Sequence, residues 1–119
     1  MTRVFVFLVL SFFATSSVAQ NAAQAAAASL RFLDRTTGVL EEVKLGVGQA
    51  IEVGALRVTL LDCRYPVRAI NRDAFAQLQV VDTNSETMVF EGWMVASSPA
   101  LNALEHPRYD VWVLRCRTS

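Results

Sequence analysis

Short stretches in which apolar and polar residues alternate recur along the chain, separated by turn residues. The longest, 56–65, is rich in β-branched and apolar residues and predicts a central strand, which Pro66 ends because proline cannot donate to a β ladder. The other stretches predicted as strands are 30–34, 39–45, 51–53, 74–82, 87–93 and 109–116. Strands at this spacing predict an all-β fold, a small antiparallel β-sandwich or barrel.

Two of the turns predict β-hairpins. Arg-Thr-Thr-Gly at 35–38 and Thr-Asn-Ser-Glu at 83–86 each separate two predicted strands and have the polar and glycine content of turns. In the strand before the second turn, Ala74, Ala76, Leu78 and Val80 fall on one side, which predicts a half-buried strand.

One short helical insertion is predicted before the last strand. Ser98 is a preferred N-cap residue, and the fixed φ of Pro99 suits the first helical position. Pro107 disfavours helical φ and ψ at the preceding residue, so the predicted helix covers 100–105. The closing strand 109–116 is then expected to bring Cys116 beside the strand 56–65.

Residues 1–19 have the features of a secretory signal peptide. Arg3 precedes an apolar run at 4–13, and Ser-Val-Ala at 17–19 fits the small-x-small pattern before a cleavage site, so Gln20 is the expected mature N-terminus. The alternative is a retained membrane anchor, but the run is about half of the roughly 20 residues that a spanning helix needs. We therefore expect a periplasmic protein that does not itself span the membrane after cleavage.

The mature chain is expected to form one domain. Removing 19 of the 119 residues leaves 100, the usual size of a single domain. The alanine-rich stretch 20–29 is uncharged and too short to hold a helix without packing, so it is interpreted as a flexible tether. The single β domain then covers 30–119.

The two cysteines, Cys63 and Cys116, predict a disulfide. Both lie in the exported part of the chain, where the compartment is oxidising. Closing this loop would stabilise the fold by about 4 kcal/mol in the chain-entropy model. Two distant cysteines and the single histidine, His106, fall short of a four-ligand metal set, so we expect no metal and no cofactor.

Charge argues against nucleic acid as a partner. Without Arg3, ten basic residues face eleven acidic ones, a net charge of −1, and duplex binding requires the neutralisation of several phosphates. Arg64, Arg68 and Arg72 cluster in sequence, and their guanidinium groups suit the oxygens of an acidic partner or of lipid phosphates. A solvated loop balanced by nearby aspartates is the interpretation that we favour.

Residue types of a nucleophilic triad occur near the C-terminus as Ser97 or Ser98, His106 and Asp110. Such chemistry needs a base within hydrogen-bond reach of the nucleophile and an oxyanion hole. The chain has no Gly-x-Ser-x-Gly motif, and Ser98 is better explained as a helix cap. We therefore predict a protein that is not an enzyme, in which His106 has a structural role.

Residues of the types that dominate binding interfaces flank the predicted helix. They are Trp93 and Met94 before it and Arg108 and Tyr109 after it. For Trp93 and Trp112 a place in the core is the interpretation that we favour, and an interface anchor is the alternative. The two flanking pairs have no evident structural role and are, with Arg64, Arg68 and Arg72, the interface candidates.

The sequence of 92–116, GWMVASSPALNALEHPRYDVWVLRC, closely resembles the signature of a family of small exported alphaproteobacterial proteins classed as a domain of unknown function, DUF2155. The similarity extends to LDRTTG at 33–38, CRYP at 63–66 and DAFA at 73–76. It implies a periplasmic protein without assigned catalytic activity. It also implies association with the respiratory chain, as an accessory subunit on the periplasmic side of the proton-pumping NADH:quinone oxidoreductase.

Two functions are therefore expected. The first is a non-enzymatic periplasmic interaction or accessory domain that binds an inner-membrane protein complex. The alternative is a β-domain that binds a small ligand or a cell-envelope polymer in a cavity lined by its aromatic residues.

Overall fold

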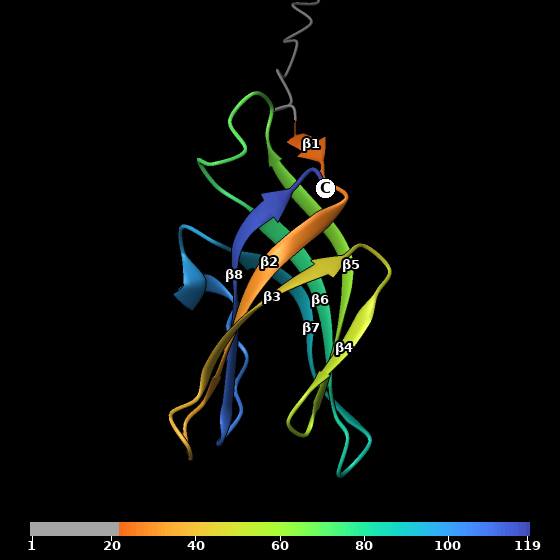
Figure 1. Ribbon diagram of the computed structural model, residues 1–119, viewed down its shortest axis with the longest axis vertical. Helices are drawn as coiled ribbons and strands as arrows, with labels where there is room; N and C mark the ends of the chain where they lie inside the picture. The colour runs from red at the N-terminus through yellow and green to blue at the C-terminus, as the bar shows by residue number, and fades with distance from the viewer. Residues whose placement is uncertain (1–21) are drawn as a thin grey trace, which may run out of the picture.

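Eight strands and one short 3-10 helix make up residues 22–119, the part of the chain that the computed structural model describes (Figure 1). The predicted signal peptide, 1–19, lies outside the described residues. The elements are β1 Ala22–Gln24, β2 Ala27–Asp34, β3 Leu40–Gly46, β4 Ala50–Val53, β5 Leu56–Pro66, β6 Phe75–Asp82, β7 Thr87–Val95, η1 Pro99–Leu101 and β8 Tyr109–Arg117. The predicted all-β class is confirmed.

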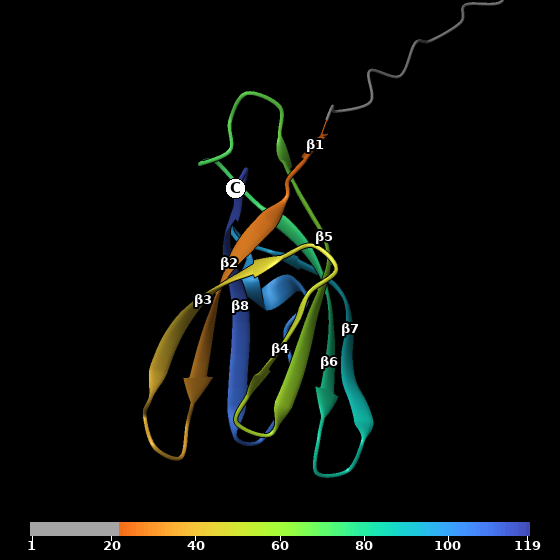
Figure 2. The ribbon, with the colours of Figure 1, turned by 45° about the vertical axis from the view of Figure 1, so that its right-hand side comes forward.

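The strands form two antiparallel sheets. In sheet A, β5 pairs with β6 along one edge and with β1 and β4 along the other, and β7 follows β6. In sheet B, β2 lies between β3 and β8. Figure 2 shows the two sheets as facing layers that diverge toward their hairpin ends.

Both predicted hairpins are present. The first pairs β2 with β3 from Leu33 opposite Leu40, across a turn in which the Asp34 side chain accepts the N–H of Thr36 at 2.9 Å and Gly38 has a φ of 76°. The second pairs β6 with β7. Positive φ favours glycine, so the last residue of the first turn suits its position.

The apolar side of each sheet faces the other sheet and forms the core. Leu30 of sheet B and Val58, Leu60, Leu78 and Val80 of sheet A are fully buried there. The alternation predicted for β6 is seen directly, since Ala76, Leu78 and Val80 are buried while the residues between them are partly exposed. The opposite side of sheet A is therefore an outer face built from regularly spaced side chains.

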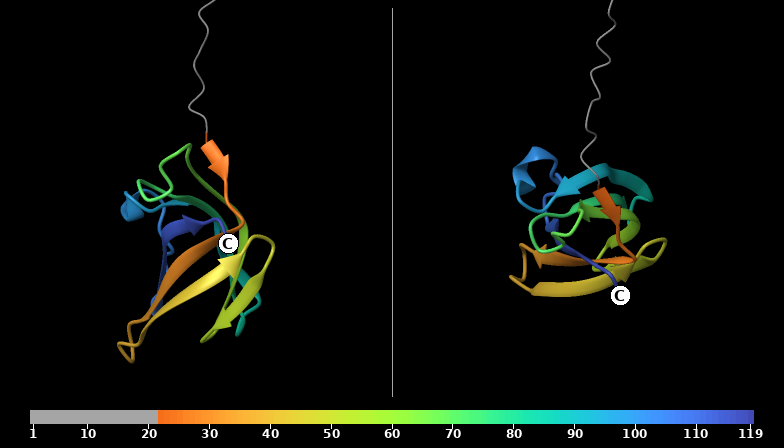
Figure 3. Two further views of the ribbon diagram at one scale, coloured as in Figure 1. Left: turned by 45° about the horizontal axis from the view of Figure 1, so that its top comes forward. Right: turned by 90° about the horizontal axis from the view of Figure 1, so that it is seen from above.

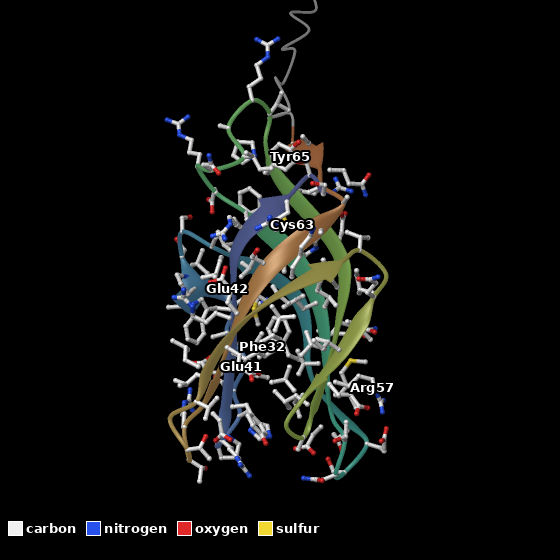
Figure 4. All side chains as sticks on the ribbon, in the orientation of Figure 1. Phe32, Glu41, Glu42, Arg57, Cys63 and Tyr65 are labelled. Atoms are coloured by element: carbon white, nitrogen blue, oxygen red, sulfur yellow. A yellow bond between two sulfur atoms is a disulfide. The ribbon has the colours of Figure 1, made fainter. Side chains whose placement is uncertain are left out.

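The predicted disulfide is present and joins the two sheets. Cys63 of β5 and Cys116 of β8 are bonded with their Cα atoms 5.8 Å apart. The closing strand does not pair with β5; it pairs with β2, and the disulfide crosses the core (Figure 4). A disulfide of this kind indicates an oxidising compartment outside the cytoplasm.

The predicted flexible tether is wrong for residues 22–29. Ala22–Gln24 pairs with the end of β5, the N–H of Ala25 donates to the carbonyl of Cys63 at 2.8 Å, and β2 begins at Ala27. Ala28 is fully buried. Small alanine side chains suit this place because they pack close to the disulfide end of the core, so the folded domain begins before residue 30.

The predicted helix 100–105 is also wrong in extent. Only Pro99–Leu101 is helical, as one 3-10 turn, and the Ser98 side chain makes no capping hydrogen bond. Beyond it the chain is extended, because Leu104 is buried in the core and Asn102 donates to the carbonyl of Trp93 at 3.0 Å. These two contacts hold the segment 96–108, and Asn102 covers part of the free edge of β7.

Candidate interaction surface

The register of β5, β6 and β7 gathers aromatic and apolar side chains on the outer face of sheet A. Phe75 lies opposite Arg64 on one side and Val95 on the other, and Gln77 lies opposite Trp93. Side chains at paired positions lie on the same face of a sheet and touch. We call Arg64, Phe75, Gln77, Trp93 and Val95 the outer patch.

The centre of the outer patch is a stacked pair. The guanidinium carbon of Arg64 lies 5.9 Å from the centre of the Trp93 ring, which is a cation–π contact. Asp62 holds Arg64 in place by accepting from its Nε at 2.9 Å, and Gln24 of β1 donates to the same carboxylate at 3.2 Å. Trp93 is 37% exposed. An ordered arginine on an exposed tryptophan needs little further ordering when a partner binds, which favours affinity.

The other interface candidates divide into three groups. Met94 and Tyr109 are buried, so the prediction that they contribute to a surface is wrong. Arg108 is exposed, but it is engaged in a two-pronged ion pair with Asp34, from its Nε at 3.1 Å and from a terminal nitrogen at 2.9 Å. Arg68 and Arg72 lie in the loop after β5, at one end of the molecule. Arg64 and Trp93 therefore remain as the centre of the site.

Neither tryptophan belongs to the core between the sheets, contrary to expectation. Residues on either side of Trp112 in β8 are buried, so its own side chain lies on the outer face of sheet B, where it is half-buried. A groove of about 360 Å³ there is lined by Trp112 together with Pro99, Ala100 and Ala103. The alternation of β8 assigns Tyr109 rather than Trp112 to the interior.

His106 has a structural place in the turn before β8. Its Nδ1 accepts the backbone N–H groups of Arg108 at 3.1 Å and Tyr109 at 3.2 Å, so Nε2 carries the ring proton and donates to Asp82 at 3.0 Å. This hydrogen bond lowers the pKa of the Asp82 carboxyl, with help from the N–H of Asn84. Both ring nitrogens are occupied by these contacts.

The structure does not assemble the triad residue types. The hydroxyl of Ser97 donates to Asp73 at 2.7 Å, and Asp110 accepts from Arg35 at 3.2 Å, so neither side chain is bonded to His106. Burial alone would raise the pKa of Asp73, but the hydrogen bonds from Ser97 and Ala74 outweigh it and lower that pKa. Ser97 and Asp73 thus join two loops, and Asp110 of β8 holds the turn that carries Arg35.

A cleft of about 300 Å³ opens between the diverging ends of the two sheets. Phe32, Val39, Val53 and Tyr109 contribute apolar surface to it, and acidic side chains stand around it. One of these, Asp34, has its pKa lowered to about 2 by its hydrogen bonds with Arg108. Trp93 and Trp112 do not line this cleft, so it is not the tryptophan-lined cavity that the alternative function predicts.

Residues 22–119 show no grouping of three or more His, Cys, Asp or Glu side chains that could hold a metal ion. The same residues include no helix long and apolar enough to cross a membrane.

Sequence reasoning missed three members of the outer patch, Phe75, Gln77 and Val95. The alternation in 74–82 places Phe75 and Gln77 on the side of the strand opposite Ala76 and Leu78. This was the one feature of the sequence that could have indicated their place on the outer face. What the sequence does not reveal is the register of β7 against β6, and this register brings Trp93 to them.

These features define a class of protein: a small extracytoplasmic β domain of two antiparallel sheets joined by a disulfide. Residues 28–116 match the family described as "Uncharacterized protein conserved in bacteria (DUF2155)", and the chain belongs to that family. The resemblance on which this family was expected is confirmed.

A curated relative is similar to most of the chain. "Uncharacterized protein RP359" of Rickettsia prowazekii (strain Madrid E) is 29% identical over an alignment of 87 residues that covers 71% of this chain. The match spans 56% of the relative's own length. No solved structure matches the chain.

Proposed function

We propose that this protein is a non-enzymatic periplasmic interaction domain that binds a protein partner through the outer patch. The observation that carries the proposal is the ordered stack of Arg64 on the exposed ring of Trp93, surrounded by Phe75 and Val95. Tryptophan and arginine are the residues most often found at the energetic centre of interfaces. The disulfide and the signal-like residues 1–19 support a periplasmic location.

The partner that we propose is an inner-membrane respiratory complex, the proton-pumping NADH:quinone oxidoreductase, in which the domain is an accessory subunit on the periplasmic side. Support for this choice comes from the family resemblance. The outer patch is compatible with it, because a sheet face with a central aromatic anchor suits docking onto a larger protein surface.

Affinity purification of the tagged protein from native membranes tests the proposal. Wild-type protein is expected to retain the respiratory complex, and W93A and R64A are expected to lose it, since removal of an interface anchor costs about 2 kcal/mol or more, roughly a thirtyfold loss of affinity. The matched control is L40S, which removes an exposed apolar side chain of sheet B. Recovery of wild-type protein only as a free monomer would overturn the proposal.

The alternative, a domain that binds a small ligand or an envelope polymer, is favoured by the apolar cleft between the sheet ends. Thermal unfolding in the presence of candidate ligands tests it. A ligand that raises the melting temperature of wild-type protein, but not that of V53D, would support the alternative over the outer patch.

A further inference from the structure

One end of the domain, opposite the hairpin ends, brings together the loop that follows β5, the start of β1 and the C-terminal residues. Figure 3 shows this end from above, with these three segments side by side. Ala22 pairs with Pro66, and a groove of about 200 Å³ is lined by Ile70 and Asn71 of the loop together with Arg117. These contacts make the end one continuous surface.

Three of the nine arginines in the described residues have no carboxylate partner, and all three lie at this end. Six arginines have a carboxylate partner within 4.0 Å, namely Arg31, Arg35, Arg57, Arg64, Arg108 and Arg115. Within 22–119, Arg68, Arg72 and Arg117 have no such partner, and the Nε of Arg117 is buried without a hydrogen-bond partner. The nearby Asp73 uses its oxygens for Ala74 and Ser97.

Apolar side chains are interleaved with these charges. Val67, the first residue of the loop, is 45% exposed, and Ile70 is partly buried between Arg68 and Arg72 in sequence. Two successive turns, closed by the N–H of Ala69 on Pro66 and that of Arg72 on Ala69, fix this arrangement. Arg68 has a φ of 65°, a conformation that costs free energy in a residue other than glycine. Arg68 adopts it in an exposed loop.

The chain also enters the domain at this end. β1 is the first described element, so the polypeptide that follows the apolar run 4–13 reaches the fold beside Arg64–Pro66. If the chain is cleaved before Gln20, the new α-amino group adds a positive charge within two residues of β1. If the apolar run is retained, it holds this end toward the bilayer.

We propose that the basic end, defined by Val67, Arg68, Ile70, Arg72 and Arg117, binds the anionic surface of the inner membrane. The three arginines contact lipid phosphates, and Val67 enters the interfacial region. Apolar side chains between unpaired arginines suit the boundary between headgroups and acyl chains. An acidic protein surface would satisfy the charges but would not account for the exposed Val67 among them. This proposal goes beyond the outer patch and does not depend on the protein partner.

Co-sedimentation of residues 20–119 with vesicles tests the proposal. Binding is expected with vesicles of equal parts phosphatidylglycerol and phosphatidylcholine, to be far weaker with phosphatidylcholine alone, and to decrease as salt increases. Each arginine near an anionic surface contributes about a fivefold increase in affinity, so R68Q/R72Q is expected to bind about 25-fold more weakly. V67S is expected to weaken binding while leaving its salt dependence unchanged.

The control is R57Q. Arg57 is 40% exposed and lies near the hairpin ends, so this variant loses one positive charge far from the basic end. R57Q is expected to bind vesicles like wild type. The proposal would be overturned if R57Q lost as much vesicle affinity as either single variant, R68Q or R72Q. It would also be overturned if wild-type protein bound equally well to anionic and neutral vesicles. The absence of wild-type binding to anionic vesicles would overturn it as well; loss of the protein partner in R68Q/R72Q would then assign the basic end to an acidic protein surface. Because the assay contains no protein partner, its outcome is separate from that of the affinity purification.

Discussion

Tyr109 shows how a side chain with the properties of an interface residue is used in the interior. Its hydroxyl accepts the N–H of Ala55 at 3.1 Å, the guanidinium carbon of Arg108 lies 5.2 Å from its ring centre, and Gly54 passes directly against its hydroxyl end. The residue type alone does not show whether a tyrosine is buried, as here, or forms part of a binding surface. The contact ties the turn between β4 and β5 to the start of β8.

Gly54→Ala is expected to destabilise the protein more than Gly38→Ala. Both glycines have positive φ, 56° and 76°, so both variants carry the strain of about 1 kcal/mol that a side chain meets there. Only at Gly54 does an added Cβ collide with the Tyr109 side chain, whereas nothing lies within 4 Å at Gly38. Chemical denaturation of the two variants measures the difference; equal losses of stability would contradict the close approach.

Asp34 is expected to make the protein acid-sensitive. Hydrogen bonds with Arg108 lower its pKa from 3.8 to about 2. The Asp34 carboxylate is therefore protonated more readily in the unfolded chain than in the folded one. The stabilisation is therefore complete above about pH 4 and is lost as the pH falls through about 2. Melting temperatures of wild type and D34N should differ at pH 5 and converge near pH 2. A constant difference over this range would refute the assignment.

At the scale of elements, alternation predicted both hairpins and the central strand, because local pattern and turn residues determine them. The pattern failed at 22–29, where alanine and serine are poor strand formers and tertiary packing decides the structure. It also failed at 100–105, where a buried leucine draws the chain out of a helix. The pairing of β8 with β2 and the contact between Arg64 and Trp93 depend on non-local register, which no local signal carries.

Truncation at the N-terminus tests whether residues 22–29 belong to the folded domain. Deletion of 20–24 removes β1 and the support of Asp62 by Gln24, and a moderate fall in melting temperature is expected. Deletion of 20–29 also removes the buried Ala28 and the first residues of β2, so the variant is expected not to fold. Circular dichroism distinguishes these results, and a fully folded 30–119 fragment would restore the tether interpretation.

For the whole molecule, the disulfide is a covalent cross-link between the two sheets, in addition to the chain segments that pass from one sheet to the other. Its loop of 53 residues corresponds to about 4 kcal/mol in the chain-entropy model. Reduction or the C63A/C116A variant is expected to lower the free energy of unfolding by about this amount, measured by urea denaturation. A reductant should have no effect on C63A/C116A; a further loss there would indicate another cause.

The distribution of charge is a second property of the whole molecule. The sequence shows it only as a cluster of arginines, Arg64, Arg68 and Arg72. The expectation of a loop balanced by Asp62 and Asp73 is met only in part. Asp62 pairs with Arg64, but Asp73 accepts from Ser97 and Ala74 instead of an arginine. Arg68 and Arg72 are thus left without these carboxylates. Three-dimensional pairing, rather than net charge, identifies the end that meets an anionic surface.

The position of β2 between β3 and β8 has a consequence for how the protein is made. β2 is synthesised near the beginning of the chain, yet one of its edges stays unpaired until the nine residues of β8 have emerged. The cysteine of β8 emerges equally late. A chain delivered N-terminus first therefore cannot complete sheet B, or form its disulfide, before its last strand is released. A nascent chain with this topology stays incompletely folded until β8 is available, and an unfolded chain is what the export proposed for this protein would require.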